Sequence, residues 1–344
     1  MNTMRDPVNN FEIPPGWIER SHIRGRELEE GIHSGKLVLL STGEILRRGY
    51  TTGTTAAAAS KAAVLSLKKD RISAVNITTP VGITISVPVR AENGKAVAIK
   101  YSGDHGEDVT NGINIIAEAK ASASITLVAG DGIGIASRDV FYLKKGEAAI
   151  NPAPQKQILT AIKEALKEID MHGAEVLLTV PSGRQIAKHT INGKLGIQGG
   201  ISILGTTGFV EPWNEHLQAS NKEQIKNAER PVLTTGRRGM RYAHILFPDR
   251  VVILIGSGIE EAVETSREYG KKTILCGLPA LILKWANPQI LTRVEYHTVT
   301  ELIEKDPFHP VISESINVAS KKYDIRIVIV DGNGTQIYDT GGTK

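Results

Sequence analysis

The triplet Thr-Thr-Gly occurs three times in this sequence, at residues 51–53, 206–208 and 234–236. Threonine and glycine expose hydroxyls and backbone N–H groups with little side-chain bulk, which suits close approach by an anion or a cofactor. The second triplet lies in the turn Gly205-Thr206-Thr207-Gly208, where the glycines could equally serve a tight turn with positive φ. Because the triplet recurs, ligand binding is favoured over a turn requirement alone.

Basic residues flank two of the triplets. Arg47 and Arg48 precede the first, and Arg237, Arg238 and Arg241 follow the third. Solubility alone explains many surface arginines. Beside glycine turns, however, guanidinium groups are suited to the carboxylates or phosphates of a ligand, because they form paired, charge-assisted hydrogen bonds.

The loop at residues 102–112 concentrates ionisable side chains, with Asp104, His105, Glu107 and Asp108 within five positions. A solvated acidic turn, in which Asp108 caps the segment that follows, is the simpler interpretation. The alternative is a proton-handling or metal-contacting loop, and a histidine beside carboxylates can accept a proton during catalysis near neutral pH. Under that interpretation Asp104 and His105 are the candidate catalytic residues.

Other familiar motifs are weak or missing from the sequence. Gly256-Ser257-Gly258 follows an apolar run, as in a dinucleotide-binding turn, but the third glycine of that motif is absent. The signatures of serine hydrolases and of nucleotide triphosphatases do not occur. The single cysteine, Cys276, and the lack of histidine pairs at ligand spacing predict neither a disulfide nor a metal site.

The amino-acid composition argues against some classes of binding partner for this protein. Lys and Arg number 41 against 37 Asp and Glu, and aromatic residues are 5%, so a nucleic-acid partner is not expected. The uncharged stretch at residues 195–210 is interrupted by glycines and is too short to span a bilayer, so no membrane association is expected. The N-terminus lacks an apolar signal sequence, and with one cysteine we expect a cytoplasmic protein.

With 344 residues, the chain is long enough for two domains. Weak periodicity predicts an N-terminal extension at residues 1–45. Residues 46–192 read as an α+β domain, with an alanine-rich helix at 55–67, alternating strands typical of an antiparallel sheet, and a helix at 152–169.

The pattern of residues 193–344 predicts a Rossmann-like α/β domain with a mainly parallel sheet. Near-continuous apolar strands at 200–205, 231–236, 251–256, 273–278 and 325–330 alternate with helices. Ligands bind such sheets beyond the carboxyl ends of the strands. We therefore expect the turns at Gly205, Gly236 and Gly256 to share one ligand-binding edge.

Four blocks resemble, in order, the cobalt-precorrin-5B C(1)-methyltransferase family of anaerobic cobalamin biosynthesis. They are LRRGYTTGTTAAAASKAA, SGDHGEDVTNG, KGEAAINPAPQKQI and GGISILGTTGFVEPW. The resemblance implies methyl transfer from S-adenosylmethionine to ring carbon 1 of cobalt-precorrin-5B, giving cobalt-precorrin-6A. It also implies an α+β domain joined to a Rossmann-like domain, in agreement with the pattern of predicted elements.

A precorrin is a flat macrocycle with acetate and propionate arms, so its site needs an apolar face ringed by N–H donors and cations. We assign substrate binding, between the domains, to Arg48, Thr51, Thr52, Gly53, Thr54 and Arg237. We assign S-adenosylmethionine binding to Gly205, Thr206, Thr207, Gly208, Gly236, Gly256 and Gly258. A nicotinamide-dependent reductase of a tetrapyrrole and a non-catalytic corrinoid carrier are the alternatives, and the sequence leaves a homo-oligomer open.

Overall fold

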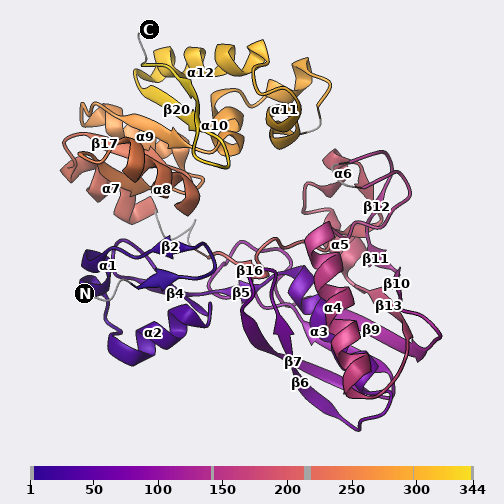
Figure 1. The fold of residues 1–344 in the computed structure, drawn as a ribbon. Coiled ribbons are helices and arrows are strands. Elements are labelled where there is room, and N and C mark those ends of the chain that lie inside the picture. Colours follow the sequence, from indigo (N-terminus) through magenta and orange to yellow (C-terminus); the bar gives the residue numbers. More distant parts are fainter. Residues whose placement is uncertain (1–3, 141–142, 213–217, 297, 342–344) are drawn as a thin grey trace. The chain divides into compact units, whose positions relative to one another are not determined.

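The computed structural model describes residues 4–140, 143–212, 218–296 and 298–341. The chain forms two compact units, Met1–Pro212 and Trp213–Lys344 (Figure 1). The sequence pattern predicts the division after residue 192, whereas residues 193–212 belong to the first unit in the structure. The described helices include none with both the length and the apolar character needed to cross a lipid bilayer.

The first 45 residues, predicted as an extension, contain several short elements. These are β1 (Arg5–Asp6), β2 (Phe11–Glu12), α1 (Pro15–Arg20), α2 (Gly25–His33), β3 (Leu37–Leu39) and the start of β4 (Ile45–Arg47). Leu28 and Ile32 on α2 are fully buried. The segment is therefore an integral part of the first unit, and its elements are too short to produce a visible hydrophobic period.

A mixed six-stranded sheet in the order β10-β13-β9-β8-β7-β6 forms the body of the first unit. Its strands are β6 (Ile72–Thr78), β7 (Thr84–Glu92), β8 (Lys95–Ile99), β9 (Asn114–Ala121), β10 (Thr126–Ala129) and β13 (Ala174–Thr179). Neighbouring strands are antiparallel, as predicted, except that β10 and β13 are parallel. Buried and exposed residues alternate strictly along β7, as expected of a strand with one covered face.

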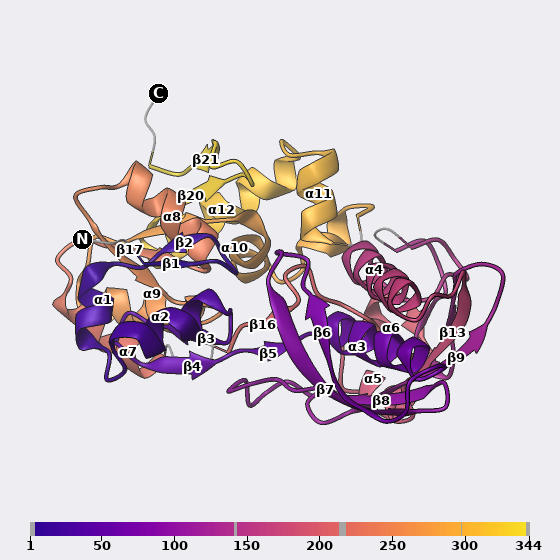
Figure 2. The same ribbon diagram turned by 60° about the horizontal axis from the view of Figure 1, so that its bottom comes forward.

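Helix α3 (Thr52–Leu65) is the centre of the first unit, and all its residues are buried. It lies between α4 (Pro152–Glu168) and the sheet, and its alanines allow close packing on both sides (Figure 2). The predicted helix at 55–67 is confirmed with an earlier start. Thr51 caps it, because its hydroxyl accepts a hydrogen bond from the Thr54 N–H.

The second unit contains a five-stranded sheet in the order β18-β17-β19-β20-β21. Its strands are β17 (Pro231–Thr234), β18 (Val251–Leu254), β19 (Ile274–Gly277), β20 (Arg326–Val330) and β21 (Gln336–Asp339). All neighbours are parallel except β20 and β21. The accompanying helices are α7 (Gln218–Asn227), α8 (Arg237–Leu246), α9 (Ile259–Glu268), α10 (Pro279–Ala286), η1 (Ile290–Arg293), α11 (Val299–Lys305) and α12 (Pro310–Tyr323). The predicted Rossmann-like alternation is confirmed from β17 onward, while the predicted start of α7 lies outside the described residues.

The segment 200–205 is not a strand of this parallel sheet, contrary to prediction. Part of it forms β15 (Gly200–Ile201), which pairs with β11 (Gly132–Ile133) inside the first unit. Ile201 and Ile203 are buried in the core of that unit, so the apolar run marks burial and not membership of the later sheet. The other short elements there are β5 (Gly49–Tyr50), β12 (Ile135–Ala136), α5 (Gly183–Ala187), α6 (Asn192–Leu195), β14 (Ile197–Gln198) and β16 (Phe209–Val210).

Candidate functional site

The strand order of the second unit creates a topological switch point beside β17. This strand pairs with β18 on one side and with β19 on the other. The connections that follow β17 and β19 therefore run toward opposite edges of the sheet, and ligands of open α/β sheets bind where this happens. The predicted turn at Gly236 lies at this point. Gly277, which ends β19 at the same point, was not singled out from the sequence.

Gly236 is a glycine that the fold itself does not require. Its φ of −162° is extended backbone, and a Cβ added there would meet no described atom within 4 Å. It precedes α8 without capping it through a side chain, so the first N–H groups of the helix face an unobstructed turn. Such N–H groups are suited to an anionic group of a ligand.

Thr234, at the end of β17, contributes an unsatisfied polar group to the switch point. The residue is fully buried, and its hydroxyl has no hydrogen-bond partner among the described residues. A Cβ added at Gly239, in the first turn of α8, would lie 2.6 Å from that hydroxyl oxygen. An unsatisfied buried hydroxyl costs about 1–3 kcal/mol, so its presence at a ligand-binding edge is consistent with function.

The predicted turn after β18 lies on the same edge, because β18 runs parallel to β17. Gly256 has a φ of +60°, which favours glycine for conformational reasons alone. Gly258, at the start of α9, has a φ of −78° and does not need to be glycine for that reason. The Ile255 N–H donates to the Thr234 carbonyl at 2.8 Å and so connects the two turns.

Two of the arginines that follow the third triplet are buried or bonded within the protein. Arg237, predicted to bind substrate, is only 3% exposed at the start of α8, so a macrocycle cannot reach its side chain in this structure. The Arg238 guanidinium donates to the Gly332 carbonyl at 3.0 Å, and the Tyr242 hydroxyl donates to the same oxygen at 2.9 Å. These two contacts attach the turn after β20 to α8.

The first two Thr-Thr-Gly triplets meet inside the first unit. The Thr51 N–H donates to the Gly208 carbonyl at 3.0 Å, and the Gly53 N–H donates to the Leu204 carbonyl at 2.9 Å. Gly205 has a φ of +136°, and a Cβ there would overlap the Thr51 side chain. The turn Gly205–Gly208 therefore packs on the start of α3 and does not lie on the edge of the parallel sheet, which was the reason for assigning it to the methyl donor.

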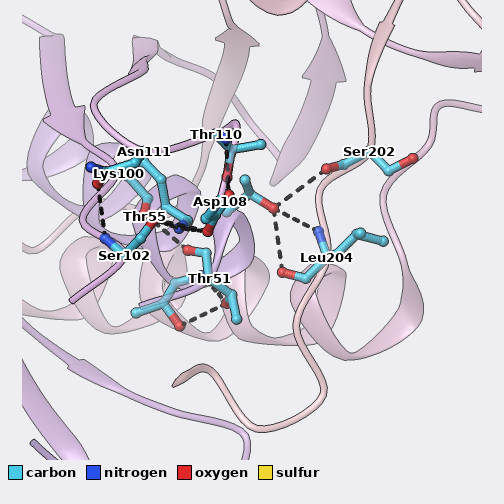
Figure 3. A network of polar contacts seen from close by, with 11 residues as sticks. Thr51, Thr55, Lys100, Ser102, Asp108, Thr110, Asn111, Ser202 and Leu204 are labelled. Carbon is cyan, nitrogen blue, oxygen red and sulfur yellow. Dashed lines mark hydrogen bonds and ion pairs between the residues drawn. The ribbon is translucent and has the colours of Figure 1, made fainter. Parts of the chain in front are cut away.

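The hydroxyls of the first triplet region are engaged within the protein (Figure 3). The Thr52 hydroxyl accepts from the Leu204 N–H at 2.8 Å, and the Thr54 hydroxyl donates to the Gly208 carbonyl at 3.0 Å. Thr52, Gly53 and Thr54 are all buried. A tight turn covers these three residues, and of the four predicted substrate contacts at 51–54 only Thr51 retains partial exposure.

The acidic loop contains a buried ionic network rather than a row of solvated carboxylates (Figure 3). The Lys100 ammonium, 2% exposed, donates to Asp108 and to the Ser102 hydroxyl, both at 2.7 Å. Burial alone would raise the pKa of Asp108, but hydrogen bonds from Lys100, Thr110 and Ser102 outweigh burial and hold it well below its usual range. Asp108 therefore stays ionised and structural, and the sequence did not identify Lys100 as its partner.

Asp104 is held differently from Asp108. Its carboxylate accepts the Arg47 N–H at 2.7 Å, while its own N–H donates to the Arg47 carbonyl at 3.0 Å, and the residue is exposed. His105 is partly exposed in the same loop. Within the described residues, no group of three His, Cys, Asp or Glu side chains could hold a metal ion.

Arg48, the other predicted substrate contact, is a structural cation. Its side chain has no exposed surface and pairs with Asp6 at 2.5 Å and with Glu211 at 2.9 Å. Burial lowers the pKa of Arg48, but the two carboxylates raise it above its usual value, so the charge persists. The sequence did not identify Asp6 as a partner of Arg48, because Asp6 lies in the segment interpreted as an extension.

Comparison with known proteins identifies the family. Residues 40–212 match the family described as CbiD. The chain is 50% identical to a cobalt-precorrin-5B C(1)-methyltransferase of Methanococcoides burtonii, over 98% of both chains, and 46% identical to one of Methanosarcina acetivorans, over 99% and 100%. This chain belongs to the CbiD family. The resemblance predicted from the four sequence blocks is therefore confirmed.

A solved structure of a CbiD protein has the same fold. The crystal structure of the cobalamin biosynthesis protein CbiD from Archaeoglobus fulgidus aligns with a TM-score of 0.67 at 34% identity, covering 95% of this chain and 100% of that one. The segment that matches the CbiD family ends at residue 212, where the first unit also ends. The acidic loop and the first two triplets lie inside that segment, and the switch point lies outside it.

Proposed function

We propose that this chain transfers a methyl group from S-adenosylmethionine to ring carbon 1 of cobalt-precorrin-5B, giving cobalt-precorrin-6A. The observation that carries the proposal is near-complete alignment, at 50% and 46% identity, with relatives named for this activity. The nicotinamide-dependent reductase has less support, because its sequence features were the Rossmann-like alternation, which many enzyme classes share, and the incomplete motif Gly256-Ser257-Gly258. A corrinoid carrier would not need the second ligand site described next.

The methyl donor binds, in this proposal, at the switch point of the second unit. Gly236, Gly256 and Gly258 remain its proposed contacts, with Thr234 and Gly277 added from the structure. The open turn at Gly236 and the first N–H groups of α8 are suited to the donor's carboxylate. Contact of the donor with Gly205–Gly208 has lost its original support, since that turn is not on the parallel-sheet edge.

In this reaction the protein mainly aligns the methyl donor with the ring carbon. As the bond from sulfur to the methyl carbon breaks, its electron pair stays on sulfur, and the ring carbon supplies the pair for the new C–C bond. The methylated ring then loses a proton. Asp104 is the proposed acceptor, because its carboxylate is exposed and is anchored to the Arg47 backbone beside the bound substrate. His105 is a second candidate in the same loop.

We also propose that the enzyme works in the cytoplasm on a small-molecule substrate. Its one cysteine, Cys276, is buried, and burial raises the pKa of the thiol to about 12, so the thiol stays protonated and unreactive. A net charge of only +4 gives no reason to invoke a nucleic-acid partner.

Calorimetric titration and single-turnover assay together test this function. We expect S-adenosylhomocysteine to bind the full chain, reduced nicotinamides not to bind, and the cobalt-precorrin to gain one methyl group by mass spectrometry. Binding of a nicotinamide without S-adenosylhomocysteine would instead support the reductase. Binding of the tetrapyrrole with neither cofactor and no turnover would support the carrier.

A further inference from the structure

The first unit contains a cavity of about 730 Å³ that none of the predicted site residues, except the buried Arg48, helps to line. It lies among α2, the β3–β5 segment, β7, β16 and the residue Tyr101 that leads into the acidic loop. Ligand pockets usually fall between about 300 and 1,000 Å³, so this volume accepts a ligand of drug size or larger. The whole cavity belongs to one unit.

Aromatic and aliphatic side chains provide the apolar part of its wall. Tyr50 and Tyr101 contact each other with ring centroids 5.8 Å apart, and Phe209 and Ile85 line the same cavity. Burial, and then the neighbouring Tyr101, raise the pKa of Tyr50, so its phenol is neutral at neutral pH. Uncharged aromatic rings can contact the face of a flat conjugated ligand without a charge penalty.

Two cations on the cavity wall have side chains without a polar partner among the residues that the structure describes. Arg47 and Lys36 are exposed, and their side chains make no hydrogen bond or ion pair with any described residue. The wall also contains two acids, Glu27 and Glu30, and Glu30 pairs with Arg26 at 3.4 Å. Uncommitted cations at the rim of an apolar cavity suit a ligand with an apolar ring and carboxylate arms.

The cavity also adjoins the acidic loop. Arg47 contributes to its wall, and the backbone of the same residue exchanges hydrogen bonds with Asp104 at 2.7 and 3.0 Å. Beneath it, Arg48 is locked by Asp6 and Glu211, which fixes the β4–β5 segment that carries Arg47 and Tyr50. A ring bound in the cavity would therefore lie close to the loop that carries Asp104.

We infer that this cavity binds the tetrapyrrole ring, with carboxylate arms directed to Arg47 and Lys36. The inference rests on the proposed function for the identity of the ligand, and it replaces a site between domains with one inside the first unit. It also makes the residues around Tyr50 substrate contacts, in place of the buried Thr52, Gly53 and Thr54.

Absorbance titration of the full chain with a stable corrin, cobyrinic acid, tests the charged contacts. We expect Arg47→Ala and Lys36→Ala each to weaken cobyrinic acid binding by about tenfold. The uncharged heptamethyl ester should bind both variants as it binds the wild type. Arg90→Ala is the control, because Arg90 is exposed on β7, a strand that lines the cavity through other residues, but Arg90 itself does not line it. Equal affinities for the acid in wild type, Arg47→Ala and Arg90→Ala would overturn the inference.

A second variant tests the cavity by filling it. Ser86 is exposed on β7 and lines the cavity, and a strand position of this kind accepts a tryptophan. Ser86→Trp should abolish binding of both the acid and the ester, with S-adenosylhomocysteine affinity and melting temperature unchanged. Unchanged corrin binding in this variant would place the ring elsewhere. The proposed function is tested separately, by measuring methyl transfer with the wild-type protein. Its outcome does not depend on how these variants bind the corrin.

Discussion

The turns Gly205–Gly208 and Thr234–Gly236 share the same sequence triplet but differ in the reason for their glycines. In the first unit, Gly205 has a positive φ and lies against Thr51, and Gly208 lies against Thr79 and Pro80. In the second unit, Gly236 has an extended backbone and open space where its side chain would be. The comparison shows that packing requires the glycines of this motif in the first unit, whereas in the second unit packing does not require Gly236.

The largest effect should come from filling the packed turn. Gly205→Val would combine overpacking against Thr51 with a positive φ that valine rarely adopts, for a loss of about 3 kcal/mol in the free energy of unfolding. Urea denaturation measures this loss. S-adenosylhomocysteine should still bind the folded fraction with wild-type affinity. A stable variant that no longer binds it would return this turn to the methyl-donor site.

The exposed and the buried carboxylates of the acidic loop extend the comparison to catalysis. Asp104→Asn should lower the single-turnover rate about a hundred-fold, because a general base is lost, with little change in methyl-donor affinity. Asp108→Asn should mainly lower stability, because it removes the negative charge that neutralises the buried Lys100 ammonium. Wild-type rates in both Asp104→Asn and His105→Ala would mean that water or the substrate's own carboxylates accept the proton.

The open turn should respond in the opposite way to the packed one. Gly236→Val adds a side chain where no described atom lies, so the melting temperature should change little. Affinity for S-adenosylhomocysteine, measured by calorimetry, should fall tenfold or more, because the added side chain occupies the space that the ligand needs. Unchanged affinity would remove the proposed methyl-donor site.

The smallest effect concerns two buried threonines. Thr54→Val removes a hydroxyl that bonds Gly208 and Gln157, so a loss of about 1–2 kcal/mol is expected. Thr234→Val removes a hydroxyl without a partner among the described residues, so stability should be unchanged or slightly higher. Thermal denaturation of the two variants side by side measures the difference. Equal losses would mean that Thr234 is already satisfied.

Much of the fold could be predicted from local pattern. The alanine-rich helix α3, the alternating strand β7 and the four parallel strands β17–β20 appear where the sequence placed them, because hydrophobic periodicity and helix propensity act over a few residues. The segment 200–205 was misassigned because an apolar run signals burial without naming the core that buries it.

The sequence by itself determined the family, since four blocks of ordered residue types were enough, and it determined the parallel alternation of the second unit. Only the tertiary structure decided which polar residues remain accessible. Arg48 is enclosed by Asp6 and Glu211 from distant parts of the chain, and Thr54 by the turn at Gly208, whereas Asp104 stays exposed. The physical reason is that a residue's type alone fixes its charge and its hydrogen-bonding groups, whereas its burial depends on segments that are far away in the chain.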